Sequence, residues 1–300
     1  MILSLPSFAR GVISVVGLSV NTVFWCSLLL IPAVLKVILP LERVTRTLNP
    51  LINGIASAWI SCNSLGMRAV TATHWQAEGV AALNYNDWYL VNCNHQTWVD
   101  IFVLQHVLNG RVPLLKFFLK QQLMYVPVIG LAWWALDFPF LKRHTRAALR
   151  KNPDLRNQDR DRARAACAKF SLAPTSVMIF VEGTRFTPEK HAAQSSTYQH
   201  LLSPKAGAMA MSLGAMGEQF HSLLDATIAY PDGAPTFWQY LCGQSSRAVV
   251  KVRQVEIPNE FCTGDYENDR AMRKTFHRWL EDLWRQKDAE LAAMLLTAPQ

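Results

Sequence analysis

The chain opens with a long apolar run. Between Arg10 and Lys36 no charged residue occurs over 25 positions, and Asn21 is the one strongly polar side chain there. Residues 11–35 are long enough to span a bilayer as a helix. A cleaved signal peptide is the alternative interpretation, but the run exceeds the usual length of such a segment and no clear small-residue cleavage site precedes Pro32. We therefore predict a membrane-spanning helix.

Two further apolar stretches are not predicted to span a bilayer. Residues 51–62 are too short to span a bilayer, so after Pro50 they predict a helix that lies against the membrane or folds back on the first helix. Residues 124–141 have the length but contain Asp137. An ionised aspartate at the centre of a bilayer costs about 2.5 to 3.5 kcal/mol. We interpret this stretch as a buried or interfacial part of the folded domain.

Shorter apolar runs predict strands at residues 88–93, 114–119, 176–181, 223–229 and 248–257. Helical patterns follow Thr97 and Asp159, and others occur around residues 204–215 and near the C-terminal end. This alternation predicts an α/β fold with a mixed central sheet flanked by helices. We divide the chain into an N-terminal membrane anchor, residues 1–65, and one α/β domain, residues 66–300.

The tail from Asp269 to Leu296 predicts a helix with one apolar face. That face carries Met272, Phe276, Trp279, Leu280, Leu283 and Trp284. A helix docked on the core is the first interpretation. Two tryptophans beside several basic residues keep a membrane-surface helix open as the second.

Positive charge is concentrated in two places, and the formal net charge is +8. Lys36, Arg43 and Arg46 follow the first apolar run, which favours a cytoplasmic position for the rest of the chain. Residues 142–169 hold ten Lys or Arg and three Asp. Such a run is usually a solvated face, and it also suits anionic headgroups or the phosphates of a substrate. No zinc-finger, RNA-binding or helix-turn-helix pattern accompanies it, so nucleic acid is not an expected partner.

A histidine and an aspartate follow the first predicted strand, as His95 and Asp100. Positions five apart lie about 140° apart around a helix, so the pair meets only if His95 precedes the helix. Thr97 and Asp100 resemble a capping box that starts the helix at Thr97. His95 is then a candidate base and Asp100 its orienting carboxylate. Two plainer interpretations stay open: Asp100 as a cap residue and His95 as a satisfied core histidine.

A second cluster follows the predicted strand at residues 176–181, as Glu182-Gly183-Thr184-Arg185. Strand ends are where sites form in α/β sheets, and a glycine there indicates a turn or a close approach of the backbone. A surface ion pair between Glu182 and Arg185 is the plainer interpretation.

Other chemistry finds little support. Six cysteines are scattered without a C-x-x-C pair, and eight histidines show no H-E-x-x-H, so neither a metal site nor a disulfide framework is indicated. The chain has no Gly-x-Ser-x-Gly elbow. Cys93 lies two residues before His95, but a small buried side chain is its favoured role over a nucleophile.

Together these blocks resemble the glycerolipid acyltransferases that act on lysophosphatidate and related lysophospholipids. The family's His-x4-Asp block matches His95 to Asp100, and its Glu-Gly-Thr-Arg block matches Glu182 to Arg185. Between them lie Lys120, the stretch Pro127-Val128-Ile129-Gly130, and Arg143. The last block, an apolar strand ending in proline, matches residues 226–231. The resemblance covers roughly residues 80 to 235, and the ordered combination is more specific than any one piece.

The match has departures. Lys142 stands where many members have Asp, and Thr97 where many have Ser. The string at residues 133–143, with Phe186-Thr187, looks more like the lysophospholipid and lysocardiolipin branch of the family.

The resemblance implies roles for the matched residues. His95 is the base and Asp100 its orienter, and acyl transfer to a hydroxyl also needs donors for the developing oxyanion. Lys120, Arg143 and Arg185 are expected to hold the phosphate of the lysolipid. Glu182 is expected to accept from the glycerol hydroxyl or to fix Arg185, with Gly183 and Thr184 in the same substrate-binding block.

The resemblance also implies an inner-membrane enzyme whose catalytic domain lies on the cytoplasmic side. We expect it to transfer an acyl group from acyl-CoA or acyl-carrier protein to 1-acyl-sn-glycerol 3-phosphate, giving phosphatidic acid, without a cofactor or metal. An acyltransferase or transacylase for another lysophospholipid is the nearer alternative. A catalytically silent scaffold that binds anionic lipid through residues 142–169 is the more distant one.

Overall fold

The computed structural model describes residues 4–71, 73–141, 170, 173–245, 247–266 and 268–296. The basic run at residues 142–169 lies outside the described residues, together with Arg143 and the helix predicted after Asp159. The interpretations that rest on that run stay predictions.

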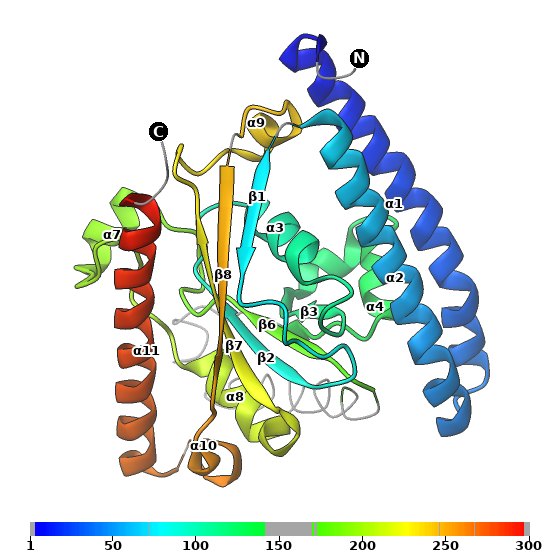
Figure 1. Cartoon of the computed structure of the whole chain (residues 1–300). Helices are drawn as coiled ribbons and strands as arrows, with labels where there is room; N and C mark the ends of the chain where they lie inside the picture. The colour runs from blue at the N-terminus through cyan, green and yellow to red at the C-terminus, as the bar shows by residue number, and fades with distance from the viewer. Residues whose placement is uncertain are drawn as a thin grey trace.

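A six-stranded sheet forms the centre of the molecule, in the order β1-β8-β7-β2-β6-β3 (Figure 1). Its strands are β1 (His74–Glu78), β2 (Tyr89–Cys93), β3 (Leu115–Phe117), β6 (Ser176–Ile179), β7 (Ser222–Ala229) and β8 (Arg247–Val255). The pair β7 and β8 is antiparallel, whereas the other neighbours are parallel. This confirms the predicted mixed sheet flanked by helices.

Every predicted strand is present, whereas β1 and a short strand at residues 140–141 were not predicted. The stretch at residues 114–119 divides into β3 and the short β4 (Leu119–Lys120), which pairs with β5 (Phe140–Leu141) in a separate two-stranded sheet. The central strands β2 and β7 are buried along their whole length, so they read as continuous apolar runs. Strand β1 lies at the sheet edge with mostly exposed side chains, so its sequence shows no such run.

Two long helices lie side by side along one flank of the molecule (Figure 1). Helix α1 (Ser7–Ile38) contains the predicted span and is long and apolar enough to cross a membrane. Helix α2 (Glu42–Val70) folds back on α1, which settles one alternative for residues 51–62. It is much longer than predicted, because Pro50 lies within the helix and does not end it. The domain boundary at residue 65 therefore falls inside α2.

Polar contacts join α1 to its neighbours. Asn21 of α1 donates to Asn63 Oδ1 of α2 at 2.8 Å, so the polar residue of the apolar run has a partner. Lys36, near the end of α1, forms an ion pair with Asp137. That aspartate follows α4 (Ile129–Ala135), which packs against α1, and the stretch at residues 124–141 ends in strand β5. The interpretation of this stretch as part of the folded domain is confirmed.

Helices cover both faces of the sheet. Helices α3 (Val99–Leu108) and α9 (Phe237–Leu241) pack on one face, and α8 (Gly207–Met216), α10 (Asn259–Thr263) and α11 (Arg270–Leu296) pack on the other. The apolar face of α11 is buried against this second core, where Trp284 donates to Leu202 O at 2.8 Å. The docked-helix interpretation of the tail is confirmed.

Helix α11 also carries a buried charge. Lys287 Nζ lies 2.9 Å from Oδ1 of Asp225 on β7, and neither side chain has exposed surface. Asp225 also accepts from Arg253 Nη2 at 2.7 Å and from Asn92 Nδ2 at 3.0 Å. A buried charge is tolerated only when it is paired and hydrogen-bonded, so this contact specifies where α11 docks.

Lys287→Met removes the fully buried partner of Asp225, which keeps its contacts with Arg253 and Asn92. We expect the free energy of unfolding to fall by about 1 to 3 kcal/mol, less than for a buried ion pair broken outright, because Arg253 still neutralises Asp225. Equilibrium unfolding in detergent, followed by tryptophan fluorescence, measures the change. The matched control on the same helix is Arg285→Met, which removes an exposed pair with Asp282 and should change little. Equal losses in the two variants would contradict this account.

Candidate active site

The loop that follows β2 places His95 at the carboxyl ends of the central strands. Asn94 extends the pairing beyond the strand, because its Oδ1 accepts from the Ile228 N–H at 2.8 Å and its Nδ2 donates to Ile228 O at 2.9 Å. The chain then leaves the sheet at His95, and α3 begins at Val99. His95 thus lies at the carboxyl ends of parallel strands, where sites form in such sheets.

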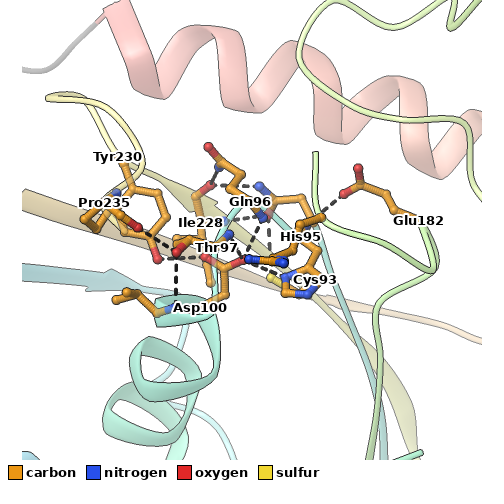
Figure 2. Close-up of polar contacts among 12 residues, drawn as sticks. Cys93, His95, Gln96, Thr97, Asp100, Glu182, Ile228, Tyr230 and Pro235 are labelled. Carbon is orange, nitrogen blue, oxygen red and sulfur yellow. Dashed lines mark hydrogen bonds and ion pairs between the residues drawn. The ribbon is translucent and has the colours of Figure 1, made fainter. Parts of the chain in front are cut away.

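His95 and Asp100 meet as predicted. Nδ1 of His95 lies 2.9 Å from Oδ2 of Asp100, whose side chain has no exposed surface (Figure 2). The same Oδ2 accepts from the backbone N–H groups of Gln96 at 2.7 Å and Thr97 at 2.9 Å. The His95 side chain is 12% exposed, and its Nε2 has no hydrogen bond within the described part of the chain. One ring nitrogen is therefore held by Asp100, while the other is available.

The predicted capping box forms only in part. The Asp100 carboxylate accepts from Thr97 N, as the box requires. The helix begins two residues later than predicted. The Thr97 hydroxyl donates to Pro235 O at 2.6 Å and accepts from the Val99 N–H at 3.4 Å, one residue before the N–H that the box requires.

Aromatic and thiol groups complete the surroundings of His95. Its ring stacks on Phe180, with centroids 4.0 Å apart and an interplanar angle of 17°. Cys93 is fully buried, and burial raises the pKa of its thiol well above the ordinary value. Its Sγ contacts Asn94 Oδ1 at 3.5 Å. A thiol that stays protonated is a poor nucleophile, which agrees with the packing role predicted for Cys93.

Glu182 lies buried beside His95. Its carboxylate is fully buried, with Oε1 accepting from His95 N–H at 2.7 Å and Oε2 from Leu202 N–H at 3.0 Å. Among the described residues Glu182 makes no hydrogen bond or ion pair with Arg185, and its predicted roles toward Arg185 and the glycerol hydroxyl stay predictions. In the structure Glu182 holds the backbone of the catalytic histidine candidate (Figure 2).

The electrostatics of Glu182 follow from this burial. Desolvation raises the pKa of Glu182 to about 7, the two backbone hydrogen bonds lower it, and the charge of Asp100 raises it further. The charge of Lys287, from the buried ion pair, lowers it. Two buried carboxylates thus flank His95, and they repel each other electrostatically.

The loop after Glu182 presents cations. The Arg185 guanidinium lies over the ring of Trp98, 5.0 Å from its centroid, and both side chains are exposed. Lys190 of α7 (Pro188–Gln194) donates to Thr184 Oγ1 at 2.8 Å and to Arg185 O at 2.9 Å. Gly183 has a φ of +68°, and the Lys205 side chain crosses it so closely that a Cβ there would lie 3.2 Å from Nζ. The Arg185 side chain is therefore exposed on this loop, whereas that of Thr184 is partly buried beneath Lys190.

The remaining site residues are not brought together in the same way. Lys120 is exposed at the end of β4 and, within the described residues, makes no hydrogen bond or ion pair with His95, Asp100 or the Gly183–Arg185 loop. Arg143 lies outside the described residues. The phosphate-binding roles of both stay predictions.

Sequence reasoning missed several groups that the fold brings to the site. They are Asn94, Trp98, Lys190, Lys205 and Tyr230, whose hydroxyl donates to Asp100 Oδ1 at 2.7 Å. Tyr230 belongs to the last of the matched blocks, and a buried hydroxyl that needs a partner is the signal that could have found it. Across the described ranges, no group of His, Cys, Asp and Glu side chains could hold a metal ion.

Comparison with known proteins places this geometry in context. A family model described as acyltransferase matches residues 75–230. The 1-acyl-sn-glycerol-3-phosphate acyltransferase 3 of Arabidopsis thaliana is 26% identical over 217 residues, covering 67% of this chain and 52% of the relative. The 1-acyl-sn-glycerol-3-phosphate acyltransferase delta of Homo sapiens is 27% identical over 214 residues, covering 67% and 51%. The chain therefore spans about half the length of these relatives.

A solved structure has a similar fold. The crystal structure of the 1-acyl-sn-glycerophosphate (LPA) acyltransferase PlsC from Thermotoga maritima superposes with a TM-score of 0.51 at 17% identity. The alignment covers 96% of each chain, so it includes the N-terminal helices as well as the sheet.

The raised pKa of Glu182 predicts a pH-dependent stability. The folded state keeps the proton up to about pH 7, whereas an unfolded glutamate loses it near its ordinary value of 4.5. Since the folded state then binds more protons between these values, this residue makes stability fall as pH rises, by on the order of 3 kcal/mol.

Thermal unfolding of the wild type and of Glu182→Gln from pH 4 to 8 measures this contribution. The stability difference between the two proteins should change steadily across this interval. Glu281→Gln, at an exposed position on α11, is the control and should change in parallel with the wild type. A constant difference between Glu182→Gln and the wild type would contradict the raised pKa.

Proposed function

This chain belongs to the acyltransferase family, and from that premise we propose that it transfers a fatty acyl group from a thioester to the free hydroxyl of a lysophospholipid. We propose 1-acyl-sn-glycerol 3-phosphate as the acceptor, so that phosphatidic acid is the product. The names of the similar Arabidopsis and human proteins support this acceptor. The observation that carries the proposal is the 2.9 Å contact between His95 Nδ1 and the buried carboxylate of Asp100.

That contact sets up a base. With Nδ1–H donating to Asp100, the neutral imidazole has its lone pair at Nε2. Nε2 takes the proton of the acceptor hydroxyl while the hydroxyl oxygen attacks the thioester carbonyl carbon. This attack forms the C–O bond of the tetrahedral intermediate, which then collapses as the carbonyl re-forms and the C–S bond breaks, and His95 returns the proton to the leaving thiolate. No enzyme nucleophile is needed, and the neutral thiol of Cys93 takes no part.

The cationic loop suits the phosphate of the acceptor. Arg185 offers a planar guanidinium with several donors, which matches a phosphate group bidentately. Trp98 supports the guanidinium through its ring face, and Lys190 fixes the loop that carries it. Glu182 keeps its carboxylate away from this surface, so it does not repel the phosphate directly. We propose Lys120 and Arg143 as additional cations for the same anion.

The thioester and the membrane complete the proposal. We propose acyl-CoA or acyl-carrier protein as the donor, with no cofactor or metal. Helix α1 anchors the chain in the membrane, and the α/β domain is the catalytic domain on the cytoplasmic face of the inner membrane. Because α2 continues to Val70, the division between anchor and catalytic domain moves from residue 65 to that residue. The length and apolar character of α1 support the anchor.

Acyl transfer by the purified protein, reconstituted in phospholipid vesicles, tests the function. Labelled acyl-CoA is offered with a panel of lysophospholipids, beside His95→Ala and Asp100→Asn. We expect transfer to lysophosphatidate, its loss in His95→Ala, and a fall in kcat of about 10²- to 10⁴-fold in Asp100→Asn, since an amide no longer enforces the working tautomer.

Each other outcome has a defined meaning. Transfer to a different lysolipid alone would keep the mechanism and change the acceptor. Absence of His95-dependent transfer from acyl-CoA, acyl-carrier protein and phospholipid donors alike would overturn the proposal and favour the lipid-binding scaffold.

Arg185→Met tests the phosphate site separately. We expect KM for lysophosphatidate to rise roughly tenfold to a hundredfold, the effect of losing one or two charge-assisted hydrogen bonds. The KM for the acyl donor should change little. Arg278→Met, at an exposed position on α11, is the matched control for the loss of one positive charge. An equal rise for both substrates would place Arg185 elsewhere in the site.

A further inference from the structure

Tyr230 contacts the catalytic pair, yet no step of the proposed reaction uses it. It follows directly after β7, and its side chain is buried. Its hydroxyl donates to Asp100 Oδ1 at 2.7 Å, on the side of the carboxylate away from His95 (Figure 2). A buried hydroxyl aimed at a buried carboxylate is a specific contact, because each group would lose a partner if the other were removed.

The two carboxylate oxygens of Asp100 accept different numbers of hydrogen bonds. Oδ2 accepts from His95 Nδ1 and from two backbone amides, whereas Oδ1 accepts from Tyr230 alone among the described residues. The three donors on Oδ2 already restrain rotation about the Cβ–Cγ bond. The Tyr230 hydroxyl supplies the donor at Oδ1, so it sets how the negative charge is shared between the two oxygens.

We propose that Tyr230 is a positioning residue for the acyl transfer, which acts through Asp100 to tune how strongly that carboxylate stabilises protonated His95. This inference rests on the proposed function. By donating to Oδ1, the hydroxyl draws part of the negative charge of Asp100 away from His95. Without it, the remaining charge favours the imidazolium more, and His95 stays protonated to higher pH.

Tyr230 acts on Asp100 as a neutral hydroxyl, and the ionisable groups around it decide how the effect can be measured. Burial and the charge of Asp100 raise the pKa of Tyr230 well above its ordinary value, so the hydroxyl keeps its proton in any assay. Cys93 is likewise held neutral by burial. The other ionisable groups that act on this cluster are Tyr240, Glu182, Asp225 and Lys287. Burial raises the pKa of Tyr240, so it also stays neutral, and the pKa of Glu182 is raised to about 7. The test must therefore separate His95 from Glu182.

Tyr230→Phe removes one oxygen atom and keeps the ring. We expect kcat on the pH plateau to fall roughly tenfold, and the acid limb of the kcat/KM profile to move to higher pH by roughly half a unit to one unit. Tyr240→Phe is the matched control, because Tyr240 is also a buried tyrosine of the same core cluster but its hydroxyl does not bind Asp100. Its acid limb should stay in place.

A second measurement assigns the shift to the histidine. Diethylpyrocarbonate reacts with neutral imidazole, so the pH midpoint for the rate of inactivation reports on His95 and not on Glu182. This midpoint should move upward in Tyr230→Phe by the same amount as the acid limb.

Four outcomes are distinguishable. If both pH midpoints equal those of the wild type, Tyr230 is a packing residue and the inference is overturned, even when kcat or thermal stability falls. A shift in the acid limb without a shift in inactivation would also overturn it, by assigning the limb to Glu182. A downward shift would reverse the proposed sign. A wild-type protein without acyl transfer would overturn the proposed function itself.

Discussion

The buried carboxylate of Asp100 is the group on which the rest of the site depends. Among the described residues no lysine or arginine contacts it, so its charge is stabilised by four donors: an imidazole, two backbone amides and a phenol. A buried carboxylate that lost these donors would carry a large desolvation cost. The donors come from the loop after β2 and from the segment after β7. The ends of these strands are thereby coupled to the start of α3.

The sheet makes this convergence possible. Strand β2 lies between β6 and β7 and runs parallel to both, so the loops that follow all three leave the sheet at one edge. His95, Glu182 and Tyr230 belong to these three loops. Glu182 and Tyr230, which lie 87 and 135 positions after His95 in the chain, are therefore brought to the same site. The buried ion pair between Lys287 and Asp225 secures α11 against β7 on the same sheet.

The two buried carboxylates of the site, Asp100 and Glu182, have different structural roles. Asp100 is hydrogen-bonded to the ring of His95, whereas within the described part of the chain Glu182 is hydrogen-bonded only to the backbone of His95 and of Leu202. Glu182 has two donors where Asp100 has four, and burial raises the pKa of Glu182 to about 7. A residue with so little support for its charge suits a structural tie between loops better than a permanent anion. Its withdrawal into the interior leaves the surface of the Gly183–Arg185 loop positively charged, which suits the phosphate site proposed above.

The sequence by itself determined the long apolar N-terminal helix, the central strands and the pairing of His95 with Asp100. These depend on local pattern: a span needs an uninterrupted apolar run, a buried strand has apolar residues on both faces, and residues five apart meet across a loop and the first turn of a helix. Tertiary structure decided the rest. The edge strand β1 is held by its ladder to β8, and α2 continues through Pro50 because it packs against α1. The roles of Glu182 and Tyr230 were equally hidden, since each is defined by a partner more than 80 residues away in the chain. A carboxylate or a hydroxyl has the same letter in the sequence whether it meets a substrate, an amide or another side chain, and only the folded arrangement of strands selects among these partners.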